Sequence, residues 1–303
     1  MPVIRTLTPP MKNGLFTSFL LLASFTLAGQ NALGYKLESG NSFTIRQHAL
    51  QDITQEMESG TQVITNDIKS IMEFTITGME DSLYLMDVEF KDLKMLMRSD
   101  LYGELMNVDT SIPKENDLQS KIFQSLIGQK VSIKMTPRGK IYEVNGGDKL
   151  IENMVNAAGF EDDFTRDMLS ASLSKDFGSE ALSKSYEQMT FFYPSQEVAI
   201  GDTWNTKFEG KLATQNTWTL SAMTEERSEI KGTAEAVLSI KDDQTSMELS
   251  GNQNSMILID PLTGLFRTLE VKGEYRGYSI IKQLGDQEIP TKIVMSLNYQ
   301  LIQ

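Results

Sequence analysis

The sequence predicts an α+β protein that is mainly antiparallel β: a curved sheet or half-barrel of two related halves, with helices from the middle of the chain. Two observations carry this prediction. Apolar residues recur at every second position in long segments on both sides of the chain's centre, which is typical of strands with one buried face. Between these segments, residues 148–190 carry apolar residues every three or four positions, as amphipathic helices do.

Two short passages with the same residue order mark the starts of the two halves. Residues 40–44 read Gly-Asn-Ser-Phe-Thr, and residues 201–205 read Gly-Asp-Thr-Trp-Asn. A Gly-Asn or Gly-Asp turn that runs into strand-forming residues predicts the start of a sheet unit. We therefore expect a single β-rich domain over residues 30–303, with pseudo-repeat halves at 35–147 and 194–303 joined by a helical segment at 148–190.

Residues 1–29 have the pattern of an export signal peptide. Basic Arg5 and Lys12 precede an apolar run from Leu15 to Ala28, which is too short to span a bilayer comfortably. The alternative is an uncleaved membrane anchor. We expect cleavage near Ala28 or Gly29, no membrane-spanning segment in the mature chain, and a product in the periplasm or outside the cell.

Composition argues against several classes of function. The chain contains no cysteine, so it has no disulfide, thiolate nucleophile or cysteine metal ligand. Removing the leader takes away two basic residues and no acid, so the formal charge falls from -13 to -15. A phosphate backbone is bound by clustered Lys and Arg, which are spread singly here. We expect no nucleic-acid partner.

Residues 35–90 predict long strands joined by a tight turn. Apolar residues occupy one side of the segment 61–77, namely Ile64, Ile68, Met72, Phe74 and Ile76. Residues 78–82 supply a turn, after which the alternation resumes at Tyr84, Met86, Val88 and Phe90. One dry face and one wet face indicate an antiparallel hairpin.

The pattern weakens between residues 98 and 113, where we expect a loop with some strand at its beginning. Asn116 or Asp117 can then cap a helix that ends at Gly128. A second hairpin follows, with its turn at residues 136–139 (Thr-Pro-Arg-Gly).

The centre of the chain predicts three short amphipathic helices. Apolar residues with helical spacing include Met154 and Met168, and Gly159 and Gly178 separate the helices.

The strand pattern returns in the second half. Trp218 and Leu297 lie on the apolar sides of alternating segments, and a turn at residues 260–264 (Asp-Pro-Leu-Thr-Gly) matches the turn at 136–139. The apolar faces of so many strands must be buried, so either the sheet curls around the central helices or two sheets pack face to face. We favour the curled sheet, because very long strands and a helical insert at mid-chain suit a half-barrel.

The phrase Pro-Ser-Gln-Glu-Val-Ala-Ile-Gly-Asp-Thr-Trp at residues 194–204 resembles one found in a group of exported Gram-negative bacterial proteins of unknown function. That group shares a signal peptide and a mid-chain Gly-Asp-x-Trp phrase. The resemblance implies export and no particular activity. The expected architecture is also similar to lipoprotein-carrier half-barrel folds, in which a curved antiparallel sheet and helices enclose an apolar pocket.

Few residues are candidates for catalysis or metal binding. His48 is the only histidine and lies on a predicted strand, while no Ser or acid occurs in a hydrolase motif. The acids at 161–163 and 242–243 lack the spacing of a calcium loop. They fit a helix N-terminus and a hairpin turn better. We expect no catalytic residue, no metal, no cofactor and no enzymatic activity.

The leading hypothesis is a non-enzymatic exported protein that binds a lipid or other hydrophobic ligand in a cavity between the curved sheet and the helices. Abundant methionine favours this, because its flexible side chain makes an adaptable pocket wall. The candidate lining residues are Ile64, Met72, Phe74, Met86, Met154, Met168, Trp218 and Leu297. The alternative is a structural or adaptor protein of the cell envelope that acts through its surface. A hydrolase that uses His48 is a third possibility.

Overall fold

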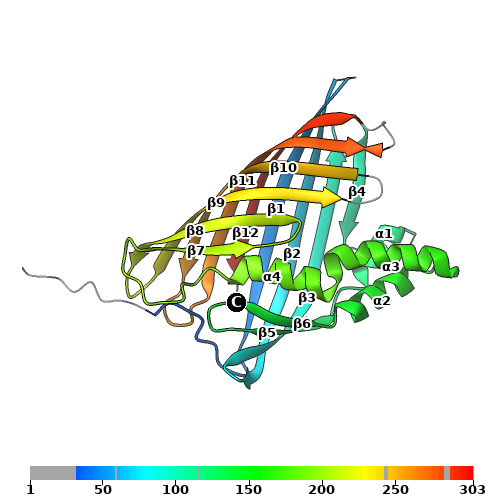
Figure 1. The fold of residues 1–303 in the computed structure, drawn as a ribbon. Coiled ribbons are helices and arrows are strands. Elements are labelled where there is room, and N and C mark those ends of the chain that lie inside the picture. The colour runs from blue at the N-terminus through cyan, green and yellow to red at the C-terminus, as the bar shows by residue number, and fades with distance from the viewer. Residues whose placement is uncertain are drawn as a thin grey trace, which may run out of the picture.

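The computed structural model describes residues 32–302, apart from 59, 113, 115, 242–244 and 283–286. The predicted signal peptide at residues 1–29 lies outside the described residues. Within them, long antiparallel strands form a single 12-stranded sheet that curves without closing, and helices from mid-chain lie against one of its faces (Figure 1).

The chain order explains this arrangement. The first half contributes β1 (Ser42–Met57), β2 (Gly60–Glu80), β3 (Leu83–Ser99), β4 (Gly103–Asp109), α1 (Leu118–Gln124), β5 (Lys130–Met135) and β6 (Ile141–Asn145). The middle contributes α2 (Gly147–Ala158), α3 (Asp163–Phe177) and α4 (Ser179–Thr190). The second half contributes β7 (Thr203–Phe208), β8 (Leu212–Met223), β9 (Ser228–Lys241), β10 (Thr245–Ile259), β11 (Phe266–Ile281) and β12 (Glu288–Leu301).

The sheet order is β6-β5-β3-β2-β1-β12-β11-β10-β9-β8-β7, with β4 paired to β3. Each half is therefore largely a meander, and the halves join where β1 pairs with β12. The predicted curved sheet is confirmed.

On the strands other than β4, one face is mainly apolar and faces inward, as the period-two pattern predicts. On β1 and β2, Phe43 lies opposite Phe74 and Ile53 lies opposite Ile64. The Phe43 and Phe74 rings stack in parallel planes with centroids 5.0 Å apart. Side chains that lie opposite each other in an antiparallel pair share a face, so these rows form the inner face of the sheet.

Two helices, α1 and α3, begin where short acidic side chains cap them, whereas α2 and α4 begin after glycines. Asp117 accepts a hydrogen bond from the Ser120 backbone N–H at the start of α1, and Asp162 accepts one from Thr165 at the start of α3. These bonds satisfy N–H groups that would otherwise lack a partner. The acids at 161–163 thus belong to a helix N-terminus, as expected.

The region between residues 98 and 113 differs from the expectation of a loop. β4 pairs with β3 from Lys94 opposite Asp109 to Ser99 opposite Gly103. Only Val108 of β4 is fully buried, so the strand shows no sustained alternation in the sequence.

The end of the half-barrel near the N-terminal segment is closed by main-chain contacts. The Tyr35 N–H donates to the carbonyl oxygen of Pro137 at 2.7 Å, and the Lys36 N–H donates to that of Thr263 at 2.7 Å. The segment therefore bridges the turns of the two halves. A side chain at Gly264, which has φ +71°, would overlap the backbone of Gly34. Only glycine fits there.

The proposed relation between the two halves stays a prediction. Gly40 and Gly201 have similar left-handed φ angles of +91° and +96°, and each lies two residues before the first strand of its half. These angles agree with the shared turn phrase, while strand lengths and the helical insert differ between the halves.

Candidate functional site

Two adjoining pockets lie between the inner face of the sheet and helix α4. The large pocket has a volume of about 820 Å³ and the small pocket a volume of about 290 Å³. Ligand sites in proteins commonly fall between roughly 300 and 1,000 Å³. The pockets share six lining residues and therefore adjoin: Gln47, Ile68, Ser185, Gln188, Leu212 and Tyr299.

Neutral side chains alone line the small pocket. Its apolar wall includes Ala49, Val271 and Leu297 on three neighbouring strands, together with the Trp218 ring on β8. The Trp218 Nε1–H donates to the Thr206 Oγ1 at 2.8 Å, which fixes the ring. The polar part of the wall consists of hydroxyl and amide side chains, including Asn66, Asn216 and Gln253.

The large pocket opens where α3, α4 and the turn between β7 and β8 meet. Charged residues gather only on this rim, namely Lys175, Asp176, Glu180, Lys184, Glu209 and Lys211. Two ion pairs order it: Lys211 Nζ lies 2.6 Å from Asp176 Oδ1, and Lys184 Nζ lies 2.6 Å from Glu180 Oε1. The first pair joins the β7–β8 turn to the end of α3.

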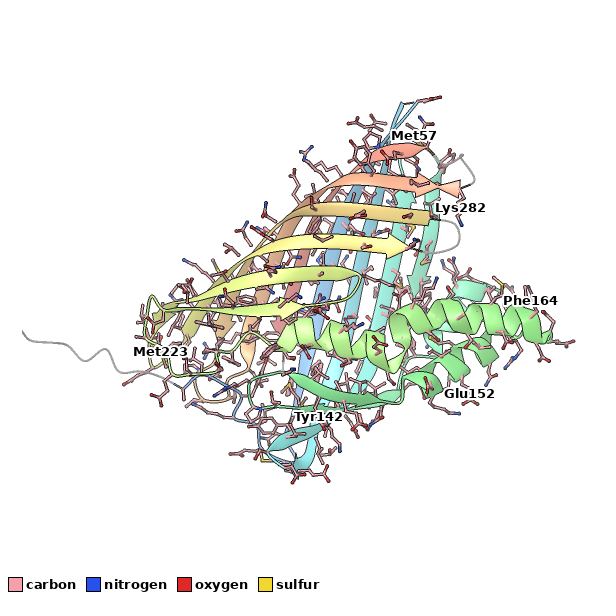
Figure 2. The ribbon with its side chains drawn as sticks, viewed as in Figure 1. Met57, Tyr142, Glu152, Phe164, Met223 and Lys282 are labelled. Atoms are coloured by element: carbon pink, nitrogen blue, oxygen red, sulfur yellow. The ribbon has the colours of Figure 1, made fainter. Side chains whose placement is uncertain are left out.

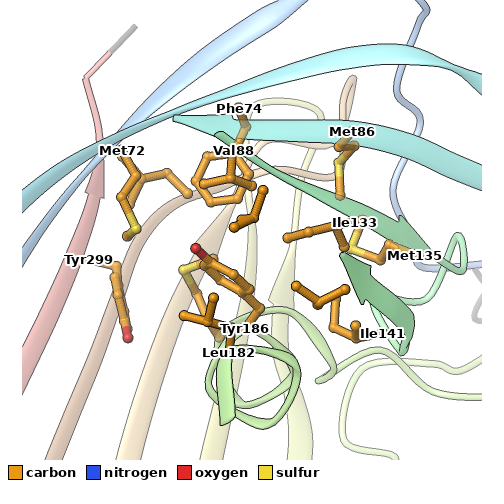
Figure 3. Packing of buried hydrophobic residues seen from close by; sticks show 14 of the residues in the cluster. Met72, Phe74, Met86, Val88, Ile133, Met135, Ile141, Leu182, Tyr186 and Tyr299 are labelled. Atoms are coloured by element: carbon orange, nitrogen blue, oxygen red, sulfur yellow. The ribbon is translucent and has the colours of Figure 1, made fainter. Parts of the chain in front are cut away.

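Two tyrosines stand between α4 and the sheet. Figure 3 shows Tyr186 reaching from α4 toward Met72 and Phe74, with Tyr299 beside it. Burial raises the pKa of Tyr299 to about 12. Burial, and then the neighbouring Tyr299, raises the pKa of Tyr186 further above its usual range. Both hydroxyls are therefore neutral at physiological pH. The Tyr186 hydroxyl is buried and has no hydrogen-bond partner among the described residues.

The predicted lining residues fall into three groups. Met72 lines the large pocket, and Trp218 and Leu297 line the small one. Phe74, Met86 and Met154 are almost fully buried in the packed core beside the pockets. Ile64 lies on the inner face opposite Ile53, away from both pockets.

The prediction for Met168 is wrong. Its side chain on α3 is 58% exposed, and that of Phe164 one turn earlier is 75% exposed. Helical spacing predicted a buried face here, but α3 packs on α2 and α4 rather than on the sheet. Figure 2 shows Phe164 at the end of the helices that extends away from the sheet.

Sequence reasoning missed the polar residues of the pocket. The inner-face rows of the strands are otherwise apolar, but they include Gln47, Asn66 and Gln253. Each is an even number of residues from apolar neighbours on its own strand, as Asn66 is from Ile68, and this spacing could have placed it on the inner face. Gln188 could not be predicted as a pocket residue, because the sequence does not show which surface α4 packs against.

The outer face of the sheet carries two shallower depressions of about 1040 and 910 Å³. They lie over β7 to β12 and the neighbouring β1, and are lined largely by side chains that point away from the helices, such as Gln215, Glu235 and Asn252. Among the described residues no helix lines them, so a ligand there would remain largely in water. The pockets under α4 are the better candidate site.

His48 lies on the outer face, outside these pockets. Its Nε2 is 2.9 Å from Asp67 Oδ1, and its side chain is 44% exposed. Desolvation acts to raise the pKa of Asp67, but the hydrogen bonds and charges of Lys69 and His48 together outweigh it and lower that pKa. Within the described residues, no group of three or more His, Asp or Glu side chains could hold a metal ion. The absence of enzymatic activity stays a prediction.

The fold and the pocket define an α+β half-barrel protein with an internal, largely neutral pocket. The chain belongs to the DUF6263 family, a family of unknown function, whose sequence profile matches residues 81–266, about three fifths of the chain. This agrees with the expected membership of an uncharacterised family. No curated protein matches the chain.

Similar solved structures include one described as showing lipid–protein interactions in lipovitellin. It has a TM-score of 0.50 and 10% identity, and the match covers 88% of this chain and 26% of that one. The chain thus spans about a quarter of the lipovitellin chain, and the likeness is one of fold.

Two further structures show lower similarity. DynF, from the dynemicin biosynthesis pathway of Micromonospora chersina, has a TM-score of 0.26 and 7% identity, with coverages of 90% and 86%. An outer membrane channel from Pseudomonas putida F1 has a TM-score of 0.25 and 7% identity, with coverages of 88% and 97%. These scores are too low to support a shared fold. In the described part of this chain, no helix has the length and hydrophobicity needed to cross a bilayer.

Proposed function

We propose that this protein is a non-enzymatic binding protein that holds a lipid or another hydrophobic ligand between its sheet and helix α4. The observation that carries the proposal is the adjoining pair of pockets, of about 820 and 290 Å³, beneath that helix. The larger volume lies in the range that ligand sites commonly have, roughly 300 to 1,000 Å³.

Other features support the proposal. The pocket wall includes Met72, Met95 and Met295, whose flexible thioethers adapt to irregular apolar ligands. The half-barrel is similar in fold to lipovitellin, a protein described by its lipid interactions. We further propose that residues 1–29 direct export, so that the ligand is met in the periplasm or outside the cell.

The first experiment asks what the protein holds. Native mass spectrometry of gently purified protein should show a bound lipid, and organic extraction should release it. The neutral hydrophobic dye N-phenyl-1-naphthylamine should then bind the stripped protein with increased fluorescence.

A matched pair of variants locates the binding. Ala49→Phe places a ring in the small pocket, whereas His48→Phe places one on the outer face of the same strand. We expect the first variant to lose dye binding and the second to keep it. Equal binding in both folded variants, or no dye binding by the parent protein, would contradict the proposal.

The alternative of an envelope adaptor that acts through its surface has one observation in its favour. Phe164 and Met168 are exposed on the end of the helical segment that extends from the sheet. An adaptor should lose its envelope partners when both are replaced by Ser, whereas the binding protein proposed here should keep its dye affinity in that variant.

A further inference from the structure

We propose that the part of the ligand buried in this pocket is electrically neutral and carries hydrogen-bonding groups, as the ester and hydroxyl groups of an acylglycerol do. The pocket should correspondingly reject a ligand that must bury an ionised carboxylate or phosphate. This inference rests on the proposed function and specifies its ligand class.

The first argument is the lack of a partner for a buried charge. Among the described residues, no Lys, Arg, Asp or Glu side chain lines the small pocket. Moving an ion out of water without a compensating charge is far more costly than moving a neutral polar group. An anionic head group would have no cation to offset that cost within the small pocket.

The second argument is the state of the charges at the rim. The large pocket has three basic residues and three acidic ones, so its rim carries no net charge. Lys211 and Lys184 already lie 2.6 Å from Asp176 and Glu180. A ligand carboxylate would have to compete with these protein carboxylates for Lys184 and Lys211, which leaves Lys175 as the lysine it would meet without such competition.

The third argument is the supply of neutral donors and acceptors. Gln47 Oε1 accepts from Ser70 Oγ at 3.2 Å, and Gln188 Nε2 donates to the Leu212 carbonyl oxygen at 3.2 Å. In each of these bonds only the oxygen or only the nitrogen of the amide contacts the protein, whereas an amide group has both hydrogen-bond donors and an acceptor. The other ends remain available to groups in the pocket they line.

The fourth argument is a pair of buried polar atoms without protein partners. Asn66 Nδ2 donates to Gln51 Oε1 at 2.9 Å, while Asn66 Oδ1 has no partner among the described residues. The hydroxyl of Tyr186, a residue only 5% exposed that lines the large pocket, also has none. Unsatisfied buried groups are costly. Of the four such atoms among the described residues, these two belong to residues that line the pockets, where a ligand would supply the missing bonds.

The experiment compares two ligands that differ by one charged group. 1-Oleoylglycerol and 1-oleoylglycerol 3-phosphate have the same chain, ester and glycerol, and each competes with the bound dye below its critical micelle concentration. We expect the neutral lipid to displace the dye at a concentration at least about tenfold lower, given the cost of burying an uncompensated charge. Equal or tighter binding of the phosphate would overturn the inference.

Two substitutions at Gln47 test the cause. Gln47→Met keeps the length and removes the amide, so affinity for 1-oleoylglycerol should fall about threefold to tenfold, as expected for one neutral hydrogen bond. Gln47→Lys supplies a buried cation and should raise the relative affinity for the phosphate. If Gln47→Lys fails to fold, Gln188→Lys on α4 makes the same test. Unchanged selectivity in a folded lysine variant counts against the inference.

The two levels of the proposal fail in different ways. If neither dye nor lipid binds, the proposed function itself is wrong and the inference falls with it. If the dye binds and the phosphate competes as well as the neutral lipid, the binding function stands and only the neutral ligand class is wrong.

Discussion

Lys211 Nζ lies 2.6 Å from Asp176 Oδ1, and this ion pair joins the turn between β7 and β8 to the last turn of α3. Both residues line the large pocket at its charged rim. Both side chains are at least half exposed, so water screens their attraction. The pair therefore contributes little to folding, but it spans the opening through which a ligand would leave.

Breaking this pair should speed ligand release. Lys211→Gln or Asp176→Asn should raise the dissociation rate of the dye roughly twofold to fivefold, which corresponds to the strength of an exposed ion pair. Unfolding by urea should hardly change. High salt should abolish the difference, because it screens the pair in the parent protein.

Lys207→Gln is the matched control. Lys207 Nζ lies 3.1 Å from Glu209 Oε1, within the same hairpin and without crossing the rim. Its removal should leave the release rate unchanged. Acceleration in Lys207→Gln and Lys211→Gln but not in Asp176→Asn would mean that net charge, rather than the link across the rim, sets the rate.

Two buried tyrosines should respond in opposite ways to loss of their hydroxyl groups. The Tyr193 hydroxyl donates to the carbonyl oxygen of Gly264, whereas the Tyr186 hydroxyl has no partner among the described residues. Tyr193→Phe should lower the free energy of unfolding by about 1–2 kcal/mol, because it leaves a buried carbonyl unpaired. Tyr186→Phe should be neutral or stabilising by up to about 1 kcal/mol.

Urea denaturation of the ligand-free protein gives both values. Tyr186→Phe should also weaken 1-oleoylglycerol binding, whereas Tyr193→Phe should not. A destabilised Tyr186→Phe variant would show that this hydroxyl has a structural partner, and it would remove one support for a hydrogen-bonding ligand.

Much of the fold could be predicted because side chains on strands alternate between faces. In β2, polar residues at every second position identify the outer face and so predict the inner face without knowledge of the neighbouring strands. β4 was not predicted as a strand because it lies at the margin of the sheet and has no continuous buried face; Leu105, for example, is 42% exposed.

The site was less predictable, since a pocket depends on which surfaces meet. Helical spacing predicted a buried apolar side for α3, yet only Leu173 of this helix is fully buried and Met168 faces water. The sequence shows that Asn66 is a polar residue on the same strand face as Ile64 and Ile68. It does not show that α4 leaves a pocket over this residue.

Gly232 should be irreplaceable because of Trp218. The two residues face each other across β8 and β9, and a Cβ at position 232 would overlap the Trp218 ring. Gly232→Ala should cost about 1–3 kcal/mol of stability, as overpacking in cores does, and should displace a ring that lines the small pocket. Dye affinity should fall together with stability.

Gly78→Ala provides the comparison within a strand of the other half. The nearest atom to its added Cβ would be Leu85 Cδ1 at 3.8 Å, an ordinary contact. Its stability and dye binding should match the parent. Tryptophan fluorescence in a Trp204→Phe background reports Trp218 alone, and an unshifted spectrum in Gly232→Ala would refute the expected displacement.

Glu187 should make stability depend on pH. It lies half-buried on α4, where its Oε2 accepts from the Ile141 N–H at 3.2 Å and so ties the helix to β6. Desolvation raises the pKa of this carboxyl, although the Ile141 hydrogen bond and nearby Lys140 act to lower it. The folded protein therefore holds this proton more tightly than the unfolded chain does.

Because of this difference in pKa, stability should fall as the pH rises. Below the unfolded pKa, both states are protonated and the group has no effect. As the pH rises through the unfolded and then the folded pKa, ionisation favours the unfolded chain, so stability is lost and remains lower at neutral pH. Glu187→Gln keeps an acceptor for Ile141 and removes the ionisation. It should be more stable than the parent at about pH 7, by less than about 1 kcal/mol because solvent reaches the side chain.

The gain should vanish at roughly pH 3, where the parent carboxyl is protonated in both states. Glu180→Gln on the same helix is the control, because the hydrogen bond from Lys184 lowers the pKa of Glu180. Removing a carboxyl whose folded pKa is lowered cannot add stability at neutral pH by this mechanism. If urea unfolding shows Glu187→Gln less stable than the parent at about pH 7, the ionised carboxylate contributes more through its bond to Ile141 than it loses through burial, and α4 is held to β6 by a charge-assisted bond.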